Sequence, residues 1–283
     1  MIKNEIISTV IPTFNRELFL KEAITSCLNQ TVKHEIVVCN HGGTDGTDLM
    51  IKQFGDKIKY IKRNHDYGPH FCWLDGIIQA KGEYINLLFD DDWIKPTFIE
   101  RCMEYFNNDV GFVFTNAEIF DQSTQKITNK IHNKFVPKSG IHNCSQYEFY
   151  FLRFLISPSS FIIRKKDIID SLYQGKLPFA KSIYRGVGPD RLMILLCILR
   201  YKKFGYVSED LSVYREHMNS ITVDSSFDIQ KKKQMKKSYI EVVDYYYTLK
   251  YGRFFSFINN RLFIISKYYL RLLINKLLNF LIK

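Results

Sequence analysis

The 283-residue sequence contains no C-x-x-C pair, no internal repeat and no low-complexity tract, and it holds only 7 prolines and 14 glycines. This composition excludes collagen-like and disordered chains and is typical of a globular protein. The six cysteines are scattered without the spacing of zinc ligands, so we expect reduced, mostly buried thiols with no assigned chemistry. The N-terminal apolar stretch is short and lacks a small-residue cleavage site, so we expect no signal peptide and a location in the cytosol.

The positive charge is unevenly distributed along the chain. The net charge is +11, of which +9 falls in residues 227–283 and +2 in residues 1–226. The larger segment contains no nucleic-acid-binding motif, so we expect no nucleic-acid partner. The Lys-rich run at 231–237 keeps nucleic-acid binding open as an alternative, which predicts binding that weakens strongly with salt.

Strand patterns alternate with helical patterns in the first part of the sequence. We predict strands at 6–12, 35–39, 57–61, 83–89 and 110–120, with helices at 17–30, 45–54, 70–82 and 97–106. This alternation favours right-handed βαβ units and a mostly parallel sheet, that is, an α/β fold.

The pattern loosens after residue 121. We predict a polar excursion or hairpin at 121–140, helices at 145–155 and 189–200, and extended chain at 159–164 and 204–217. A charged break then precedes two aromatic-rich helical stretches. We therefore divide the chain into a domain of residues 1–225 and a helical tail of residues 226–283.

Three consecutive carboxylates, Asp90, Asp91 and Asp92, follow the predicted strand at 83–89. Polar loops follow the earlier strands, at 12–16, 40–47 and 63–69. Because ligands of open α/β sheets bind beyond the carboxyl ends of the strands, we expect these segments to meet. A divalent cation, Mg²⁺ or Mn²⁺, would neutralise the acids and hold a diphosphate. The alternative is that the acids cap the next helix and face solvent.

The segment "STVIPTFNRELFLKEAITSCLNQTVKHEIVVCNHGGTDGT", followed by "GEYINLLFDDDW", resembles the family 2 glycosyltransferases of the GT-A fold. The resemblance runs through residues 6–100 and resumes at 157–168, 188–196 and 214–222. It implies a GT-A sheet flanked by helices, with a nucleotide-binding half at 1–120 and an acceptor-binding half at 121–225. It also implies an inverting transferase for a nucleotide-diphospho-sugar donor, a UDP-sugar by default. The implied acceptor is a hydroxyl of a glycan or lipid-linked glycan in bacterial surface-polysaccharide synthesis.

Matching the family motifs residue by residue implies a role for each site residue. Asp91, Asp92 and His217 would bind the metal, Mn²⁺ or Mg²⁺. Asp190, which opens the helix at 189–200, would be the base that takes the acceptor's proton, with helix capping as the alternative. Trp93 and Arg215 would contact phosphate or acceptor. The implied nucleotide-binding residues are Pro12, Thr13, Phe14, Asn15, Arg16, Asn40, His41, Asp45, Gly68 and Asp90.

The sequence departs from the family pattern at four positions that are usually acidic. Asn40 and His41 replace two aspartates, Phe89 replaces the first aspartate of the metal motif, and Pro189 precedes Asp190 in place of an acid. Because the second of the two aspartates contacts a uridine base in the family, His41 makes dTDP-, CDP- and GDP-sugars credible donors. The missing acids also leave open a catalytically degenerate protein that binds sugar nucleotides without transferring the sugar.

Residues 253–283 place basic residues on one half of a predicted helix and apolar and aromatic residues on the other. Such a helix is too charged to span a membrane and fits the interface of an anionic one. We therefore expect peripheral contact with the inner face of the cytoplasmic membrane. Packing of this helix on the domain, or in a homodimer, is the alternative.

Overall fold

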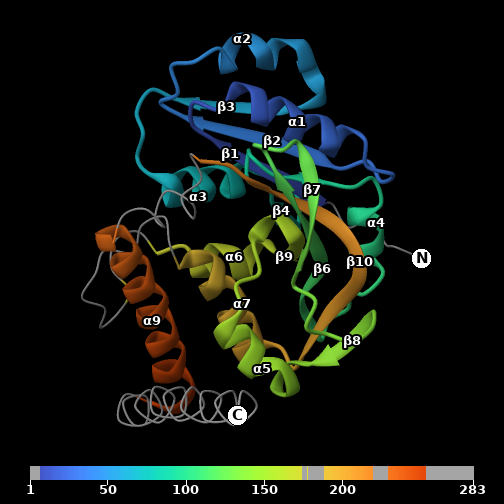
Figure 1. Cartoon of the computed structure of the whole chain (residues 1–283), viewed down its shortest axis with the longest axis vertical. Helices are drawn as coiled ribbons and strands as arrows, with labels where there is room; N and C mark the ends of the chain where they lie inside the picture. Colours follow the sequence, from blue (N-terminus) through green and yellow to red (C-terminus); the bar gives the residue numbers. More distant parts are fainter. Residues whose placement is uncertain (1–6, 174–176, 178–187, 219–228, 253–283) are drawn as a thin grey trace, which may run out of the picture.

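The computed structural model describes residues 7–173, 177, 188–218 and 229–252, which form a ten-stranded sheet with helices on both faces (Figure 1). Eight strands follow the order β3-β2-β1-β4-β9-β6-β10-β5, while β7 pairs with β6 and β8 pairs with β10. This arrangement confirms the predicted α/β class. It also joins both halves of the predicted domain in one continuous sheet.

The first half of the described chain folds as successive βα units. β1, β2, β3 and β4 run parallel to one another, which confirms the predicted βαβ arrangement. The predicted helix at 45–54 is shorter than expected: the α-helix covers only Thr47–Ile51, and a 3₁₀ segment with Gly55 at φ 52° follows it. The elements are β1 (Ile7–Thr13), α1 (Glu17–Leu28), β2 (Glu35–His41), α2 (Thr47–Ile51), η1 (Lys52–Lys57), β3 (Lys59–Arg63), α3 (Pro69–Gln79) and β4 (Tyr84–Leu87).

The second half inserts an antiparallel strand into the sheet. β9 runs antiparallel to both β4 and β6, and β6 and β10 are then parallel to each other. The elements are β5 (Trp93–Ile94), α4 (Phe98–Met103), β6 (Val110–Asp121), β7 (Lys126–His132), β8 (Gly140–Asn143), α5 (Cys144–Arg153), η2 (Pro158–Ser160), β9 (Phe161–Arg164), α6 (Lys165–Ser171), α7 (Pro189–Arg200), β10 (Lys203–Glu216) and α9 (Ile229–Tyr251). Of these, β5, β8 and α6 were not predicted, because two to seven residues carry too little periodicity to recognise.

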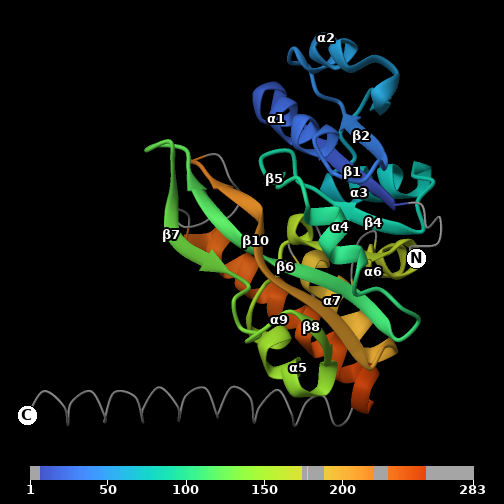
Figure 2. The same cartoon turned by 90° about the vertical axis from the view of Figure 1, so that its right-hand side faces the viewer.

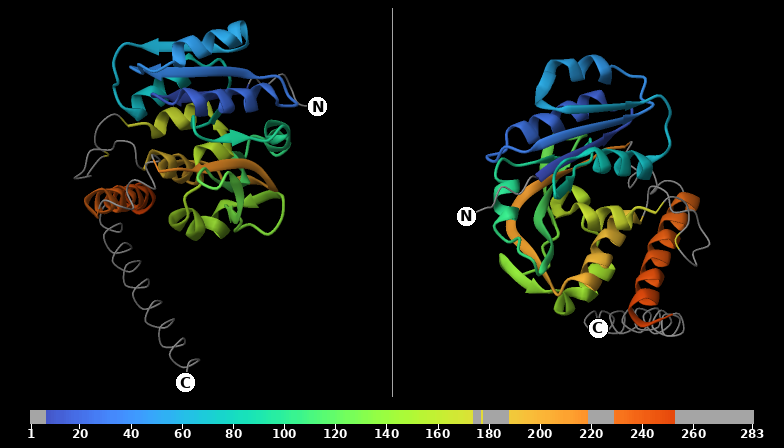
Figure 3. Two further views of the ribbon diagram at one scale, coloured as in Figure 1. Left: turned by 45° about the horizontal axis from the view of Figure 1, so that its top comes forward. Right: turned by 180° about the vertical axis from the view of Figure 1, so that it is seen from behind.

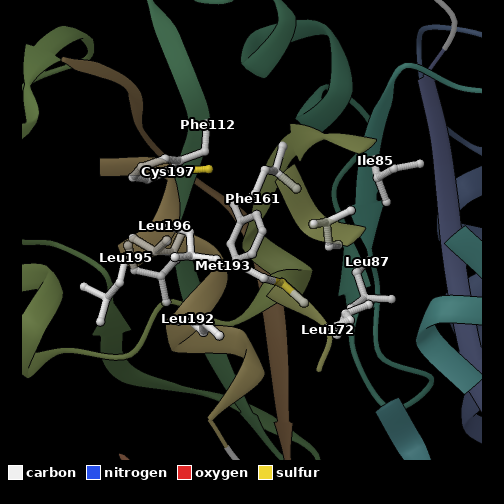
Figure 4. Close-up of a cluster of buried hydrophobic side chains, with 14 of the residues drawn as sticks. Ile85, Leu87, Phe112, Phe161, Leu172, Leu192, Met193, Leu195, Leu196 and Cys197 are labelled. Atoms are coloured by element: carbon white, nitrogen blue, oxygen red, sulfur yellow. The ribbon is translucent and has the colours of Figure 1, made fainter. Parts of the chain in front are cut away.

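Successive strand residues point to opposite faces, and each face is covered by its own hydrophobic core. Ile11 of β1 belongs to the core beneath α1, α2 and α4, whereas its neighbour Val10 belongs to the core beneath α3, α5, α6 and α7. Figure 4 shows part of the second core, where Met193 of α7 lies near Phe161 of β9. The apolar helix predicted at 189–200 is therefore a core helix.

The helix α9 packs on α7: Figure 2 shows it behind α7 and α5, and Figure 3 shows it at one side of the body. Val242 and Tyr246 of α9 are buried in the same core as α7. The first part of the predicted tail therefore rests on the domain, and the boundary near residue 225 stays a prediction. The predicted membrane-binding segment at 253–283 lies outside the described residues. Within the described ranges, no helix combines the length and apolar character that crossing a membrane requires.

Candidate active site

The carboxyl ends of several strands come together at one end of the sheet. Thr13 of β1 lies opposite Asn40 of β2, and His41 of β2 lies opposite Arg63 of β3. Residues 90–92 follow β4, after which the chain turns into β5 and pairs antiparallel with the end of β10. Because β10 runs in the same direction as β4, its last residues reach the acidic segment.

Residues from β1 and the loop after it hold the first two carboxylates of the acidic segment. Pro12 and Thr13, at the end of β1, are buried, and the Thr13 hydroxyl donates to Asp90 Oδ2 at 2.8 Å. Nη1 of Arg16 donates to Asp90 Oδ1 at 3.0 Å and to Asp91 Oδ2 at 2.8 Å. One guanidinium thus bridges two adjacent carboxylates and offsets their mutual repulsion.

The second and third carboxylates face different partners. Asp91 Oδ2 lies 3.1 Å from His217 Nε2, directly after the end of β10. Asp92 Oδ1 instead accepts a hydrogen bond from the backbone N–H of Arg215 at 3.1 Å. The structure therefore brings Asp91 and His217 together, and it ties Asp92 to the backbone of β10.

Arg215 fastens the acidic segment to β10 and α1. Its Nε donates to the backbone carbonyl of Asp91 at 3.0 Å, its Nη1 donates to Gln122 Oε1 at 2.5 Å, and its Nη2 donates to Glu22. The side chain is only 4% exposed. Its role as a phosphate contact stays a prediction, and Glu22 and Gln122 were not among the predicted site residues. The guanidinium also lies over three rings, at 4.6 Å from Phe19, 4.8 Å from Trp93 and 5.2 Å from Phe120.

Burial and neighbouring charges separate the pKa values of the three carboxyls. Burial, followed by the charge of Asp91, raises the pKa of Asp90 to about 6. The same two causes raise the pKa of Asp92 well above its ordinary value. Burial alone would raise the pKa of Asp91, but His217 and Arg16 lower it. Asp91 is therefore the carboxyl of the three that is most readily ionised.

The donor atoms of Asp91 and His217 fit a divalent cation. A carboxylate oxygen and an imidazole nitrogen 3.1 Å apart form a mixed donor set that Mn²⁺ accepts. The Asp91 side chain is 14% exposed, so an ion can reach it from solvent. The bridge that Arg16 makes to Asp90 and Asp91 further indicates that this position attracts positive charge.

Two side chains fold the loop after β2 against the start of α1. Asn15, which is left-handed at φ 54°, accepts a hydrogen bond from the backbone N–H of Thr44 at 2.7 Å through Oδ1. Asp45 Oδ2 accepts from the backbone N–H of Glu17 at 3.0 Å. The two predicted nucleotide-binding loops are therefore cross-linked before any ligand binds.

The turn at the end of β2 depends on Asn40 and Gly42. Asn40 Oδ1 accepts a hydrogen bond from the backbone N–H of Gly43 at 3.0 Å, and its Nδ2 donates to the Tyr60 hydroxyl at 2.9 Å. Gly42 is left-handed at φ 75°, and a Cβ there would lie 2.7 Å from the backbone nitrogen of Asp66. This position therefore requires glycine.

His41 is buried at the end of β2 and faces Asp75 of α3. Its Nε2 lies 3.2 Å from Asp75 Oδ2, and Arg63 donates to the same carboxylate at 2.7 and 2.9 Å. Burial alone would lower the pKa of His41, but Cys39 and Asp75 raise it. The hydrogen bond from Arg63 lowers the pKa of Asp75. Asp75 was not predicted, although two basic residues at the ends of adjacent parallel strands are a signal that an acid lies nearby.

Aromatic side chains border His41 on its outer side. The ring centroids of Tyr67 and Phe71 lie 6.2 and 5.7 Å from that of His41. Gly68, between the two aromatics in sequence, is the N-cap residue of α3 and has φ 90°. Phe14, in the loop after β1, is 47% exposed, and Tyr67 is 56% exposed. Exposed flat rings of this kind can stack on a planar ligand such as a nucleobase.

Asp190 lies at the start of α7 and contacts α9. Its Oδ1 accepts a hydrogen bond from the backbone N–H of Arg191 at 2.8 Å, and the Tyr239 hydroxyl donates to its Oδ2 at 3.4 Å. Burial raises the pKa of Asp190, as a base that operates near neutral pH requires. The hydrogen bond to Arg191 also satisfies one N–H of the first turn, although the N-cap residue of α7 is Gly188. Tyr239 was not predicted, because only the packing of α9 brings it here.

Solved structures share this fold. Staphylococcus aureus TarS 1–349 has a TM-score of 0.59 and 14% identity, over 86% of this chain and 80% of that chain. The mannosyltransferase PcManGT of Pyrobaculum calidifontis, in complex with GDP-Man and Mn²⁺, has a TM-score of 0.53 and 12% identity, over 83% of this chain and 63% of that chain. These likenesses confirm the predicted GT-A fold.

Curated relatives and a family model match the sequence itself. The GalNAc(5)-diNAcBac-PP-undecaprenol beta-1,3-glucosyltransferase of Campylobacter jejuni is 29% identical over 170 residues, 58% of this chain and 53% of that protein. The minor teichoic acid biosynthesis protein GgaB of Bacillus subtilis is 27% identical over 218 residues, 74% of this chain and 23% of that protein. The chain thus spans about half of the first relative's length and less of the second's. The model of glycosyl transferase family 2 matches residues 8–169, more than half of the chain. The chain therefore belongs to glycosyl transferase family 2.

Proposed function

We propose that the protein is a metal-dependent inverting glycosyltransferase that moves a sugar from a nucleotide-diphospho-sugar to a hydroxyl of a glycan or lipid-linked glycan. The observation that carries the proposal is the convergence of Asp91, His217 and Arg16 beside the cross-linked loops after β1 and β2. The relatives' names, an undecaprenol-linked glucosyltransferase and a teichoic acid biosynthesis protein, support a role in surface-polysaccharide assembly.

The donor would lie across the carboxyl ends of β1, β2 and β4. Asp91 and His217, with Asp92 as the third predicted ligand, would hold Mn²⁺ or Mg²⁺. When bound, the metal would stabilise negative charge on the leaving diphosphate. Arg16 now neutralises the charge of Asp91. With a metal ion in that role, the Arg16 guanidinium would be close enough to contact the same diphosphate.

The acceptor hydroxyl would be deprotonated by Asp190. The oxygen of the acceptor hydroxyl would form a bond to the anomeric carbon as the bond from that carbon to the diphosphate breaks. The proton of the hydroxyl would pass to the Asp190 carboxylate. A raised pKa suits this role, because the carboxyl then binds a proton more strongly near neutral pH. The Tyr239 hydroxyl, which donates to Asp190 Oδ2, would orient the base.

The nucleotide is tested by measuring binding of UDP, dTDP, CDP and GDP by calorimetry, with Mn²⁺ and with EDTA. Structural neighbours are complexes with UDP, UDP-GlcNAc and GDP-Man, so these nucleotides come first. We expect one nucleotide to bind in the presence of Mn²⁺ and its sugar conjugate to be hydrolysed slowly. Full activity of Asp91→Asn, or full activity in EDTA, would overturn the metal dependence.

The second candidate is a sugar-nucleotide-binding protein without transferase activity. The observation that favours it is the replacement of usual acids by Asn40, His41 and Pro189. It predicts tight nucleotide binding with neither donor hydrolysis nor transfer to any glycan or lipid-linked acceptor. Measurable hydrolysis that Asp91→Asn abolishes would exclude this candidate.

The tail provides the proposed link to the membrane. Residues 253–283 would lie at the inner face of the cytoplasmic membrane through their apolar half, with the basic residues toward anionic headgroups. This location would bring the site close to a lipid-linked acceptor. Packing in a homodimer is the competing role of this segment.

A further inference from the structure

Cys39, His41 and Cys72 form a buried cluster, and as a group they have no role in the proposed transfer reaction. Each residue offers one ligand atom, and these three atoms lie within 4.8 Å of one another. Cys39 and His41 are two residues apart in β2 and therefore point to the same face of the sheet. Cys72 comes from α3, which covers that face. None of the three is more than 5% exposed.

One ring nitrogen of His41 has no hydrogen-bond partner among the residues that the structure describes. Its Nε2 lies 3.2 Å from Asp75 Oδ2, and an ionised carboxylate can only accept a hydrogen bond. In the neutral ring the proton therefore belongs on Nε2, which leaves a lone pair on Nδ1. Among the described residues, Nδ1 is buried without a hydrogen-bond partner. A histidine whose other nitrogen donates to a carboxylate is the usual arrangement at a metal.

We propose that Cys39, Cys72 and His41 bind a thiophilic divalent cation, with Zn²⁺ as the expected ion and water in the fourth position. Zn–S bonds of about 2.3 Å and Zn–N bonds of about 2.0 Å place neighbouring ligand atoms roughly 3.3–3.8 Å apart. From separations of up to 4.8 Å, the cluster therefore needs to contract by at most about 1–1.5 Å. Cys72 Sγ, which now donates to the backbone carbonyl of Cys39 at 3.2 Å, is the ligand that would turn.

This site differs from the one at Asp91 in chemistry and position. Two sulfurs and an imidazole select zinc over Mg²⁺ and Mn²⁺, whereas carboxylate oxygens prefer the harder ions. The cation would tie the end of β2 to α3, beneath the loop at 40–47 and the aromatics that border His41. Its expected role is to fix the floor of the nucleotide site. The lack of C-x-x-C spacing in the sequence does not argue against this zinc site, because the fold brings Cys72 of α3 next to Cys39 and His41 of β2.

The test is titration of the purified, reduced full-length protein with Co²⁺ and Zn²⁺. We expect retention of one equivalent of Zn²⁺ after gel filtration, and a thiolate-to-cobalt charge-transfer band with Co²⁺. Cys39→Val and Cys72→Ala should each lose the band. Cys102→Ala, a buried cysteine of the other core, and Asp91→Asn should keep it. No band in the wild type, or an unchanged band in both cysteine variants, would overturn the proposal.

A second measurement needs no variant and so does not depend on how the substitutions fold. X-ray absorption at the zinc edge of the Zn²⁺-loaded wild type should show two sulfur neighbours and at least one imidazole nitrogen. A coordination shell of oxygen and nitrogen alone would overturn the proposal and assign the ion to Asp91 and His217. Circular dichroism of each variant verifies that loss of the cobalt band does not follow from loss of the fold.

Discussion

Asp90 should make the folded protein less stable as the pH rises through the weakly acidic range. The carboxyl is 5% exposed, and burial together with Asp91 raises its pKa to about 6. In the unfolded chain the pKa of this carboxyl is about 3.9. Between these values the folded protein binds more protons than the unfolded chain, so the free energy of unfolding falls as the pH rises. A difference of about two pKa units corresponds to roughly 3 kcal/mol.

The substitution Asp90→Asn isolates this contribution. The amide has the size of the neutral carboxyl, can still accept from the Thr13 hydroxyl, and leaves Arg16 in contact with Asp91. At about pH 4 the variant and the wild type should therefore differ little, because both side chains are uncharged in the folded state. At about pH 7 the variant should be more stable by roughly 3 kcal/mol, since it no longer buries a charge.

The assay is urea unfolding in EDTA at a series of pH values, with circular dichroism as the readout. Asp56→Asn is the matched control, because it removes an exposed carboxylate and so measures the effect of net charge alone. Parallel pH profiles for the wild type and Asp90→Asn would refute the reasoning. They would mean that the contacts with Thr13 and Arg16 fully compensate the ionised carboxylate.

Three further predictions concern the reaction, the core and the tail. Asp190→Asn should reduce turnover by about 10²–10⁴-fold and leave donor affinity nearly unchanged, whereas Asp91→Asn should weaken both. Calorimetry of donor binding, measured beside transfer rates, separates the two outcomes. Near-normal transfer by Asp190→Asn would make this residue only a helix cap. Leu192→Ala empties a fully buried position of α7 and should cost about 2–5 kcal/mol in chemical denaturation, a loss that an exposed site such as Leu49→Ala should not reproduce. Deletion of residues 253–283 should abolish sedimentation with anionic vesicles, and continued sedimentation would contradict the interfacial helix.

The sequence predicted the parts of the fold that carry strong periodicity. The strands that became β1, β2, β3, β4 and β6 and the helices that became α1, α3 and α7 all exist at the predicted places. The position of the acidic segment next to the polar loops followed from the rule that parallel strands end together. The insertion of β9 between β4 and β6 did not follow, because four residues do not reveal which strands they will pair with.

The candidate site was predictable wherever motif residues contact one another directly. Asp91, Arg16 and His217, predicted from the family resemblance, meet as a group. The residues that support two other predicted site residues were missed: Asp75 supports His41 from a helix, and Tyr239 reaches Asp190 from α9. Such contacts join positions 34 and 49 residues apart, and no local pattern encodes them.

The strand β10 determines when during synthesis the site can be completed. It pairs with β5, β6 and β8, and the two residues that contact the acidic segment lie at its end (Arg215) and directly after it (His217). A nascent chain that ends before residue 203 already carries Asp90, Asp91 and Asp92 but lacks every basic group that β10 brings to them. Because contacts distant in sequence form late, Asp91 and Asp92 remain without these partners until more than 120 further residues have been synthesised. Slow translation between β6 and β10 would therefore prolong exposure of the half-built sheet and its unpaired edge to aggregation.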